Sequence, residues 1–281
     1  MATLIIARLT FRELLRRRLI LALLSLTAIV IGLTVWGFSR VPGLHLGGVP
    51  LTPAEIQIAA AQLLLLVMFM FSFVFALTCA FVAAPAIAGD VESGVAQAVL
   101  ARPVRREELL LGRWLGLAVP VAIYAVASST AEFLLVDWTT GYLPREIVAA
   151  EGALVVEGLV LLTFTLALST RISAITAGVI SVIAFGTMWL GGVAGAFGQV
   201  FHNQAITEVG VITHFLLPTD GLWRAAVFGM EPASFVVLAR HGLGSSFQAS
   251  SGASAGYLAW VGFWLLAVLA VALLSFRTRE I

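Results

Sequence analysis

The sequence predicts an all-helical membrane protein, and three observations lead to this class. Of its 281 residues, 60% are hydrophobic and 11% are charged, which is too apolar for a soluble domain of this length. Six mainly apolar runs are each long enough to cross a hydrocarbon core of about 30 Å as a helix. No ten-residue alternating pattern suggests a barrel, so the backbone must satisfy its hydrogen bonds within helices. The predicted spans of this single domain, residues 1–281, are 19–39, 57–83, 114–136, 151–168, 174–197 and 256–276.

The arginines predict how the spans are oriented. Six spans place both termini on the same side, and the flanking segments on that side carry twelve of the sixteen basic residues, all of which are arginine. The positive-inside rule makes that side cytoplasmic. The chain is therefore predicted to be a multi-pass protein of the cell membrane with both termini in the cytoplasm.

The segment before the first span, residues 1–18, predicts an amphipathic helix in the cytoplasmic interface. Arg8, Arg12 and Arg16 recur every fourth residue and form a basic stripe along one side of a helix. An apolar surface accompanies the stripe and consists of Leu4, Phe11, Leu14 and Leu15. The alternative is a plain juxtamembrane anchor without a separate helix.

Polar residues interrupt the apolar pattern at 85–113, between the second and third spans. Pro85 is expected to bend or end the second span, and Gly94 permits a break in the backbone. A short helix from Val95 to Ala101 should end at Arg102, because the following proline disfavours helical angles there. A new helix with glutamates in its first turn then leads into the third span. This helix–break–helix segment is predicted to project from the membrane into the cytoplasm.

The outer segments differ in character. Residues 40–56 are rich in Gly and Pro and predict a turn-filled connection. Residues 198–255 are too long for a hairpin and too apolar for a disordered linker, so one or more short helices are expected, either packed at the outer membrane surface or dipping into it. One should follow the N-cap signal at Pro218–Asp220, and another should run from Glu231 through Arg240.

Apart from Glu151, the first residue of the fourth predicted span, two carboxylates fall within the predicted spans, where charge is costly and marks functional candidates. Glu132 and Glu157 could line a translocation path. Alternatively, each could pair with an outer arginine or lie shallow enough to reach interfacial water, and this second reading is favoured for Glu132. The small residues Gly191, Gly192 and Gly195 permit close helix packing, either within the chain or between two copies.

The other candidate chemistry is weak. The four histidines show no metal-ligand spacing and no G-x-S-x-G motif exists, so neither a metal site nor a catalytic residue is predicted. The chain contains no lysine and therefore cannot carry a Walker A loop of its own. Nothing in the sequence predicts nucleic-acid binding.

The segment at 85–113 resembles the cytoplasmic loop of type-2 ABC transporter permeases. That loop reads roughly E-x-E-x-G-T, then a Leu-Leu pair, P-V-S-R, and Gly-Lys before the third span. The matching positions are Asp90, Glu92, Gly94, Leu100, Pro103, Val104, Arg106 and Gly112. The departures include Val95 for Thr, Arg105 for Ser and Arg113 for Lys, and Arg105 removes the expected N-cap of the helix that follows.

The resemblance implies a bacterial exporter-like permease subunit whose loop is a coupling helix docked on a separate ATP-binding subunit. The implied docking residues are Asp90, Glu92, Gly94, Leu100, Arg102, Pro103, Arg105 and Arg106. It also implies a second permease copy, and ATP with Mg on the partner ATPase rather than any cofactor in this chain. The loop could instead be an ordinary solvated connection that only enforces topology.

Two functions follow from these expectations. The first is a membrane subunit that exports or flips an unidentified substrate under ATP power. The second is a membrane scaffold that transports nothing and transmits ATPase-driven motion to an external protein through 198–255. The sequence does not identify a substrate for the first.

Overall fold

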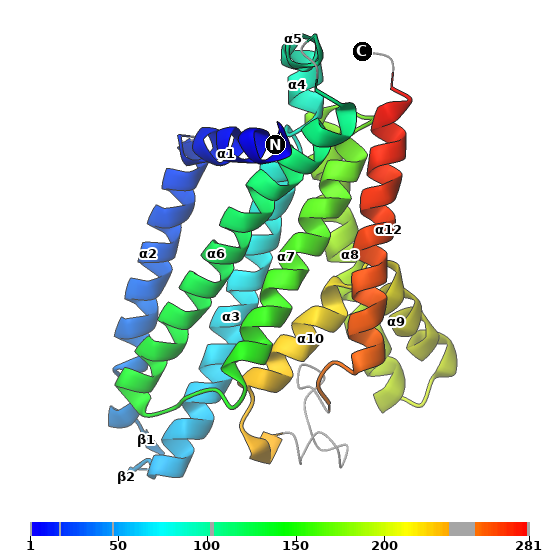
Figure 1. Ribbon diagram of the computed structural model, residues 1–281. Coiled ribbons are helices and arrows are strands. Elements are labelled where there is room, and N and C mark those ends of the chain that lie inside the picture. Colours follow the sequence, from blue (N-terminus) through cyan, green and yellow to red (C-terminus); the bar gives the residue numbers. More distant parts are fainter. Residues whose placement is uncertain (1, 17, 47, 102–103, 236–250, 280–281) are drawn as a thin grey trace.

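A computed structural model describes residues 2–279 apart from 17, 47, 102–103 and 236–250, and it confirms an all-helical membrane architecture (Figure 1). Within this described part, six helices are long and apolar enough to cross a membrane. They are α2 (Arg18–Phe38), α3 (Pro53–Ala83), α6 (Arg106–Thr140), α7 (Ile147–Ser169), α8 (Ala174–Val200) and α12 (Ala255–Arg277). These six helices match the six predicted spans, with boundaries that extend into the flanking polar residues.

Both described ends of the chain lie at the same end of the bundle, together with two short helices that project beyond it (Figure 1). These are α4 (Ala88–Glu92) and α5 (Val95–Leu100). Helix α1 (Ala2–Leu15) lies across the bundle at this end, separate from α2, so the predicted amphipathic segment is a helix of its own. The opposite end holds a short 3₁₀ turn (η1, Val41–Gly43) and a small antiparallel pair, β1 (His45–Leu46) and β2 (Val49–Pro50).

Local signals explain where the second span begins and ends. The Thr52 hydroxyl accepts a hydrogen bond from the Glu55 backbone N–H at 3.3 Å, and the Glu55 carboxylate accepts one from the Thr52 N–H at 2.7 Å. This reciprocal capping box, followed by a proline in the first turn, fixes the start of α3. At the other end α3 stops at Ala83, just before Pro85, as the proline predicts.

Helix α7 is the most enclosed span and organises the core. Leu154, Leu161 and Leu166 on this helix are fully buried between α3, α6, α10 and α12. Gly158 lets the Phe75 ring of α3 press against the α7 backbone, because a Cβ at this glycine would lie 2.5 Å from the ring. The packing of α7 thus sets its rotation in the bundle, and with it the direction of its glutamate side chains.

The outer segment dips into the bundle, which is one of the two placements predicted for its short helices. It contains α9 (Gln204–Leu216) and α10 (Thr219–Met230), and both run alongside the outer half of the spans rather than over them (Figure 1). Helix α10 begins at Thr219, so Thr219 and Asp220 lie in its first turn and are not its N-cap. Most of α10 is buried, including Leu222 and Ala226, because it packs directly against α7. The second predicted helix, from Glu231 to Arg240, lies largely outside the described residues.

The glycines of α8 are used within the chain. A Cβ at Gly195 would lie 2.6 Å from the backbone of Gly210 on α9, and one at Gly191 would meet Thr213. Gly192 faces the Asp220 carboxylate of α10 in the same way. Small residues therefore allow α9 and α10 to pack closely on α8. Of the two alternatives, packing within the chain is the one observed at these positions.

Candidate functional site

The projecting elbow is built from two short helices separated by two residues, Ser93 and Gly94. Helix α4 ends at Glu92, and Gly94 then adopts a left-handed conformation with φ of +75° before α5 begins. Only glycine takes this angle without strain. The Ser93 hydroxyl donates to the Gly89 carbonyl at 2.6 Å and closes the last turn of α4. The break predicted at Gly94 is confirmed.

The helix after the elbow is capped although Arg105 stands where the resembling loop has a serine. Arg105 is extended and precedes the first turn of α6, and its backbone N–H donates to the Glu108 carboxylate at 3.0 Å. An arginine side chain has no acceptor, so only this half of a capping box forms. Glu107 and Glu108 also place negative charge at the positive end of the helix dipole.

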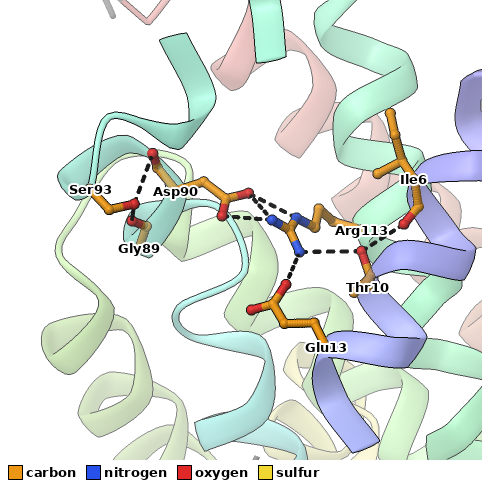
Figure 2. Close-up of polar contacts among 7 residues, drawn as sticks. All are labelled: Ile6, Thr10, Glu13, Gly89, Asp90, Ser93 and Arg113. Atoms are coloured by element: carbon orange, nitrogen blue, oxygen red, sulfur yellow. Dashed lines mark hydrogen bonds and ion pairs between the residues drawn. The ribbon is translucent and has the colours of Figure 1, made fainter. Parts of the chain in front are cut away.

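The centre of the site is Arg113, which joins three helices (Figure 2). Its guanidinium donates twice to Asp90 of α4, at 2.8 and 2.7 Å, in the bidentate geometry that arginine offers a carboxylate. It also donates to Glu13 of α1 at 2.7 Å and to the Thr10 hydroxyl at 3.3 Å. The Arg113 side chain is only 12% exposed. We call Arg113, Asp90, Glu13 and Thr10 the Arg113 hub.

Two glycines bring α1 close enough to reach the hub. A Cβ at Gly112 would lie 2.7 Å from Ile6, and one at Gly116 would lie 2.6 Å from the Ala7 carbonyl oxygen. On the same face Thr10 and Leu14 are buried. Sequence reasoning missed this contact, although the signal was present: Gly112 and Gly116 form a G-x-x-x-G pair, the spacing at which helices approach closely.

The basic stripe of α1 lies away from this packed face. Arg8, Arg12 and Arg16 are exposed, as expected for charges facing water or lipid head groups. Four apolar residues of α1 are also exposed and supply a surface suited to the interfacial region: Leu4, Ile5, Leu9 and Leu15. The helix therefore has a third face, packed on α6, that the sequence pattern did not predict.

The predicted docking residues divide into groups. Asp90 belongs to the hub, and Glu92 accepts a hydrogen bond at 3.4 Å from the Ala174 N–H in the first turn of α8. Arg105 is exposed. Arg102, Pro103 and the side chain of Leu100 lie outside the described structure. Docking of an ATPase on these residues stays a prediction.

Arg106 holds the end of the last span. Its guanidinium donates to the backbone carbonyls of Phe276, Arg277 and Arg279 at the C-terminal end of α12. Carbonyls in the last turn of a helix lack the usual intrahelical partner, although the Phe276 carbonyl also accepts from the Arg279 N–H at 3.4 Å. A cation also suits the negative end of the helix dipole. An ion pair between Arg277 and Glu107 reinforces the same contact. Arg106 thus has a structural role that the docking prediction did not include.

Substitutions at the neighbouring residues Arg105 and Arg106 test whether Arg106 stabilises the end of α12. We expect Arg106→Ala to release the end of α12 and lower the free energy of unfolding by about 1–3 kcal/mol, because three backbone carbonyls there lose a charged donor. Hydrogen exchange of the amides at 274–278 should accelerate. Arg105→Ala, the matched control, should leave both quantities unchanged, because this side chain is exposed. Equal exchange in the two variants would contradict the Arg106 assignment.

Both intramembrane glutamates are buried inside the bundle. Glu132 lies within hydrogen-bonding reach of Thr34 on α2, and its second carboxylate oxygen has no partner in the described part of the chain. It is neither paired with an arginine among the described residues nor exposed to interfacial water, which corrects the reading favoured from sequence. Glu157 accepts a hydrogen bond from Ser72 of α3 at 2.9 Å. A role for either residue in a translocation path stays a prediction.

Comparison with known proteins agrees with this arrangement. The family model described as ABC-2 family transporter protein matches residues 4–281. A search of curated proteins gives no match. Because the family model covers nearly the whole chain, including α1, the elbow and all six spans, the chain belongs to the ABC-2 family of transporter proteins and is a membrane subunit of an ABC transporter.

Proposed function

We propose that this subunit exports or flips a substrate across the cell membrane, and that a separate ATP-binding subunit docks on the elbow at residues 90–113. The observation that carries the proposal is the projection of α4 and α5 beyond the bundle, with α4 tied to α1 and α6 through the Arg113 hub. Force applied to a rigid elbow is transmitted to the spans, whereas a flexible loop would absorb it.

The orientation and partners follow from this role. The end that carries both termini faces the cytoplasm, where ATP is available, and the positive-inside rule supports the same orientation. ATP and Mg are held by the partner subunit, since this chain lacks lysine and hence a Walker A loop. Two copies of this chain and two ATPase subunits form the working complex, in the membrane of a prokaryotic cell.

The proposal is tested by purifying the tagged chain from its native membrane in mild detergent. We expect a P-loop ATPase to copurify, and its ATPase activity in reconstituted vesicles to respond to a panel of lipids and drugs. Stimulation only by an external protein would indicate the non-transporting scaffold instead. Failure of any ATPase to bind or respond to this chain would contradict the proposal.

Gly94 offers a sharp test of the elbow. Gly94→Ala should lower the stimulation of the partner ATPase by this subunit roughly tenfold. Alanine at this positive φ costs about 1–2 kcal/mol, and a change in the angle between α4 and α5 would relieve that strain. Gly141→Ala is the matched control: Gly141 has φ of +70°, also faces open space, and ends α6 at the opposite end of the bundle. ATPase activity of the complex is the measurement. Equal losses in the two variants would show that backbone strain alone explains the effect.

A further inference from the structure

A small cavity lies in the outer half of the bundle, between α3, α7, α8 and α10. Its volume of about 10 Å³ suits a single water molecule. Most of its lining is aromatic, and its polar walls are supplied by Ser72, Glu157, Thr219 and Asp220. A site of this size does not accommodate a lipid, drug or peptide.

Two polar atoms of the cavity walls have no hydrogen-bond partner among the residues that the structure describes. They are the second carboxylate oxygen of Glu157 and the hydroxyl oxygen of Thr219, in side chains that belong to residues only 2% and 1% exposed. The first oxygen of Glu157 is already satisfied by Ser72. Buried polar groups are rarely left without a partner, since each costs about 1–3 kcal/mol. One water between Glu157 and Thr219 would satisfy both.

Among the described residues, no cation forms an ion pair with Glu157. Asp220 faces the same cavity, and Arg224 donates to Asp220 at 2.9 Å and to the Gly192 carbonyl at 2.8 Å. The one guanidinium described here is therefore already bound to the other carboxylate. An ionised Glu157 would add a second negative charge to a buried, largely apolar site, which is strongly unfavourable.

The other titratable groups described near Glu157 lie on α3, α12, α9 and α6. Cys79 of α3 is buried, Tyr257 of α12 donates to the Pro218 carbonyl, and α8 carries no titratable residue. His214 of α9 is 30% exposed and stands 4.0 Å from Asp220. On α6, Tyr124 bonds Thr27 and Glu132 lies toward Thr34.

We propose that Glu157 is a proton-binding site: it carries a proton and donates it to one bound water, which also bonds the Thr219 hydroxyl. Through these hydrogen bonds, the proton and the water link the N-terminal turn of α10 to α3 and α7. Releasing the proton would leave the carboxylates of Glu157 and Asp220 in one cavity with a single guanidinium. Loss of the proton is therefore linked to separation of α10 from the spans. The assignment concerns this chain alone and does not rest on the transport role proposed above.

Infrared spectroscopy of the full chain in detergent at neutral pH tests the proton. We expect the C=O stretching band of a protonated carboxylic acid, and expect Glu157→Gln to remove intensity from it without changing the ionised carboxylate bands. The matched control is Glu151→Gln, a partly exposed glutamate of the same helix that accepts from Thr130; it should remove carboxylate intensity instead. If Glu157→Gln removes only carboxylate intensity, Glu157 is ionised and the proposal is overturned.

Thr219→Val tests the water. If a water bonds Thr219, the nearly isosteric valine removes one of its partners, so the melting temperature should fall and the Glu157 band should shift. If no water is bound, valine removes an unsatisfied hydroxyl and the melting temperature should rise, which would overturn the proposal. Replacing sodium in the buffer with choline should leave the spectrum unchanged. A sodium-dependent change in the carboxylate bands would instead identify a cation site and would also overturn it.

Discussion

Arg113→Ala is expected to destabilise the protein by about 2–4 kcal/mol and to abolish stimulation of the ATPase by this subunit. The substitution removes two hydrogen bonds to Asp90 and one to Glu13, and it leaves the largely buried Asp90 carboxylate without its guanidinium. Helix α4 would then lose its attachment to α1. Thermal unfolding of the purified chain measures the first effect, and ATPase activity of the reconstituted complex measures the second.

Two further variants test whether the geometry of the Arg113 hub, rather than positive charge alone, explains these effects. Arg113→Lys keeps the charge but cannot form the bidentate pair with Asp90 while also holding Glu13, so it should retain intermediate stability and coupling. Arg12→Ala removes an exposed arginine from the adjacent helix and should change stability by less than about 0.5 kcal/mol. If Arg12→Ala were as damaging as Arg113→Ala, the general basic charge of this end would explain the effect.

The features predicted from sequence are those that short stretches of chain determine. Hydropathy sets the six spans, because a helix in lipid must satisfy its own backbone. Pro85 and Gly94 act on their own backbone angles, so the end of α3 and the break between α4 and α5 could be placed without knowledge of neighbouring helices.

The features that were missed depend on how distant helices are rotated against one another. From the sequence, Arg106 was predicted to bind the ATPase subunit. Its role at the end of α12 depends on residues 170 or more positions away. The cavity around Glu157 needs the register of α10 against α7, which hydropathy does not specify. The G-x-x-x-G pair at Gly112 and Gly116 was a readable signal, but the sequence did not name α1 as its partner.

This close contact between α1 and α6 supports the second large prediction. Gly116→Ala is expected to separate α1 from α6 and cost about 1–3 kcal/mol, because the new methyl group would lie 2.6 Å from the Ala7 carbonyl oxygen, a backbone atom that cannot rotate away. Glu13 and Thr10 would move out of reach of Arg113. The same loss of ATPase coupling should therefore follow, although every charge of the hub is still present.

A single introduced thiol makes the separation measurable. Thr10 is buried against Gly116, and the native Cys79 is buried, so a Thr10→Cys variant should react slowly with a water-soluble maleimide. Adding Gly116→Ala should raise the labelling rate at position 10 at least tenfold. The matched control is Gly186→Ala on α8, where a new methyl group meets nothing within 4 Å; it should leave labelling unchanged. Slow labelling in the Gly116→Ala protein would mean that α1 stays docked by other contacts, and the loss of coupling would then need another cause than its release from the hub.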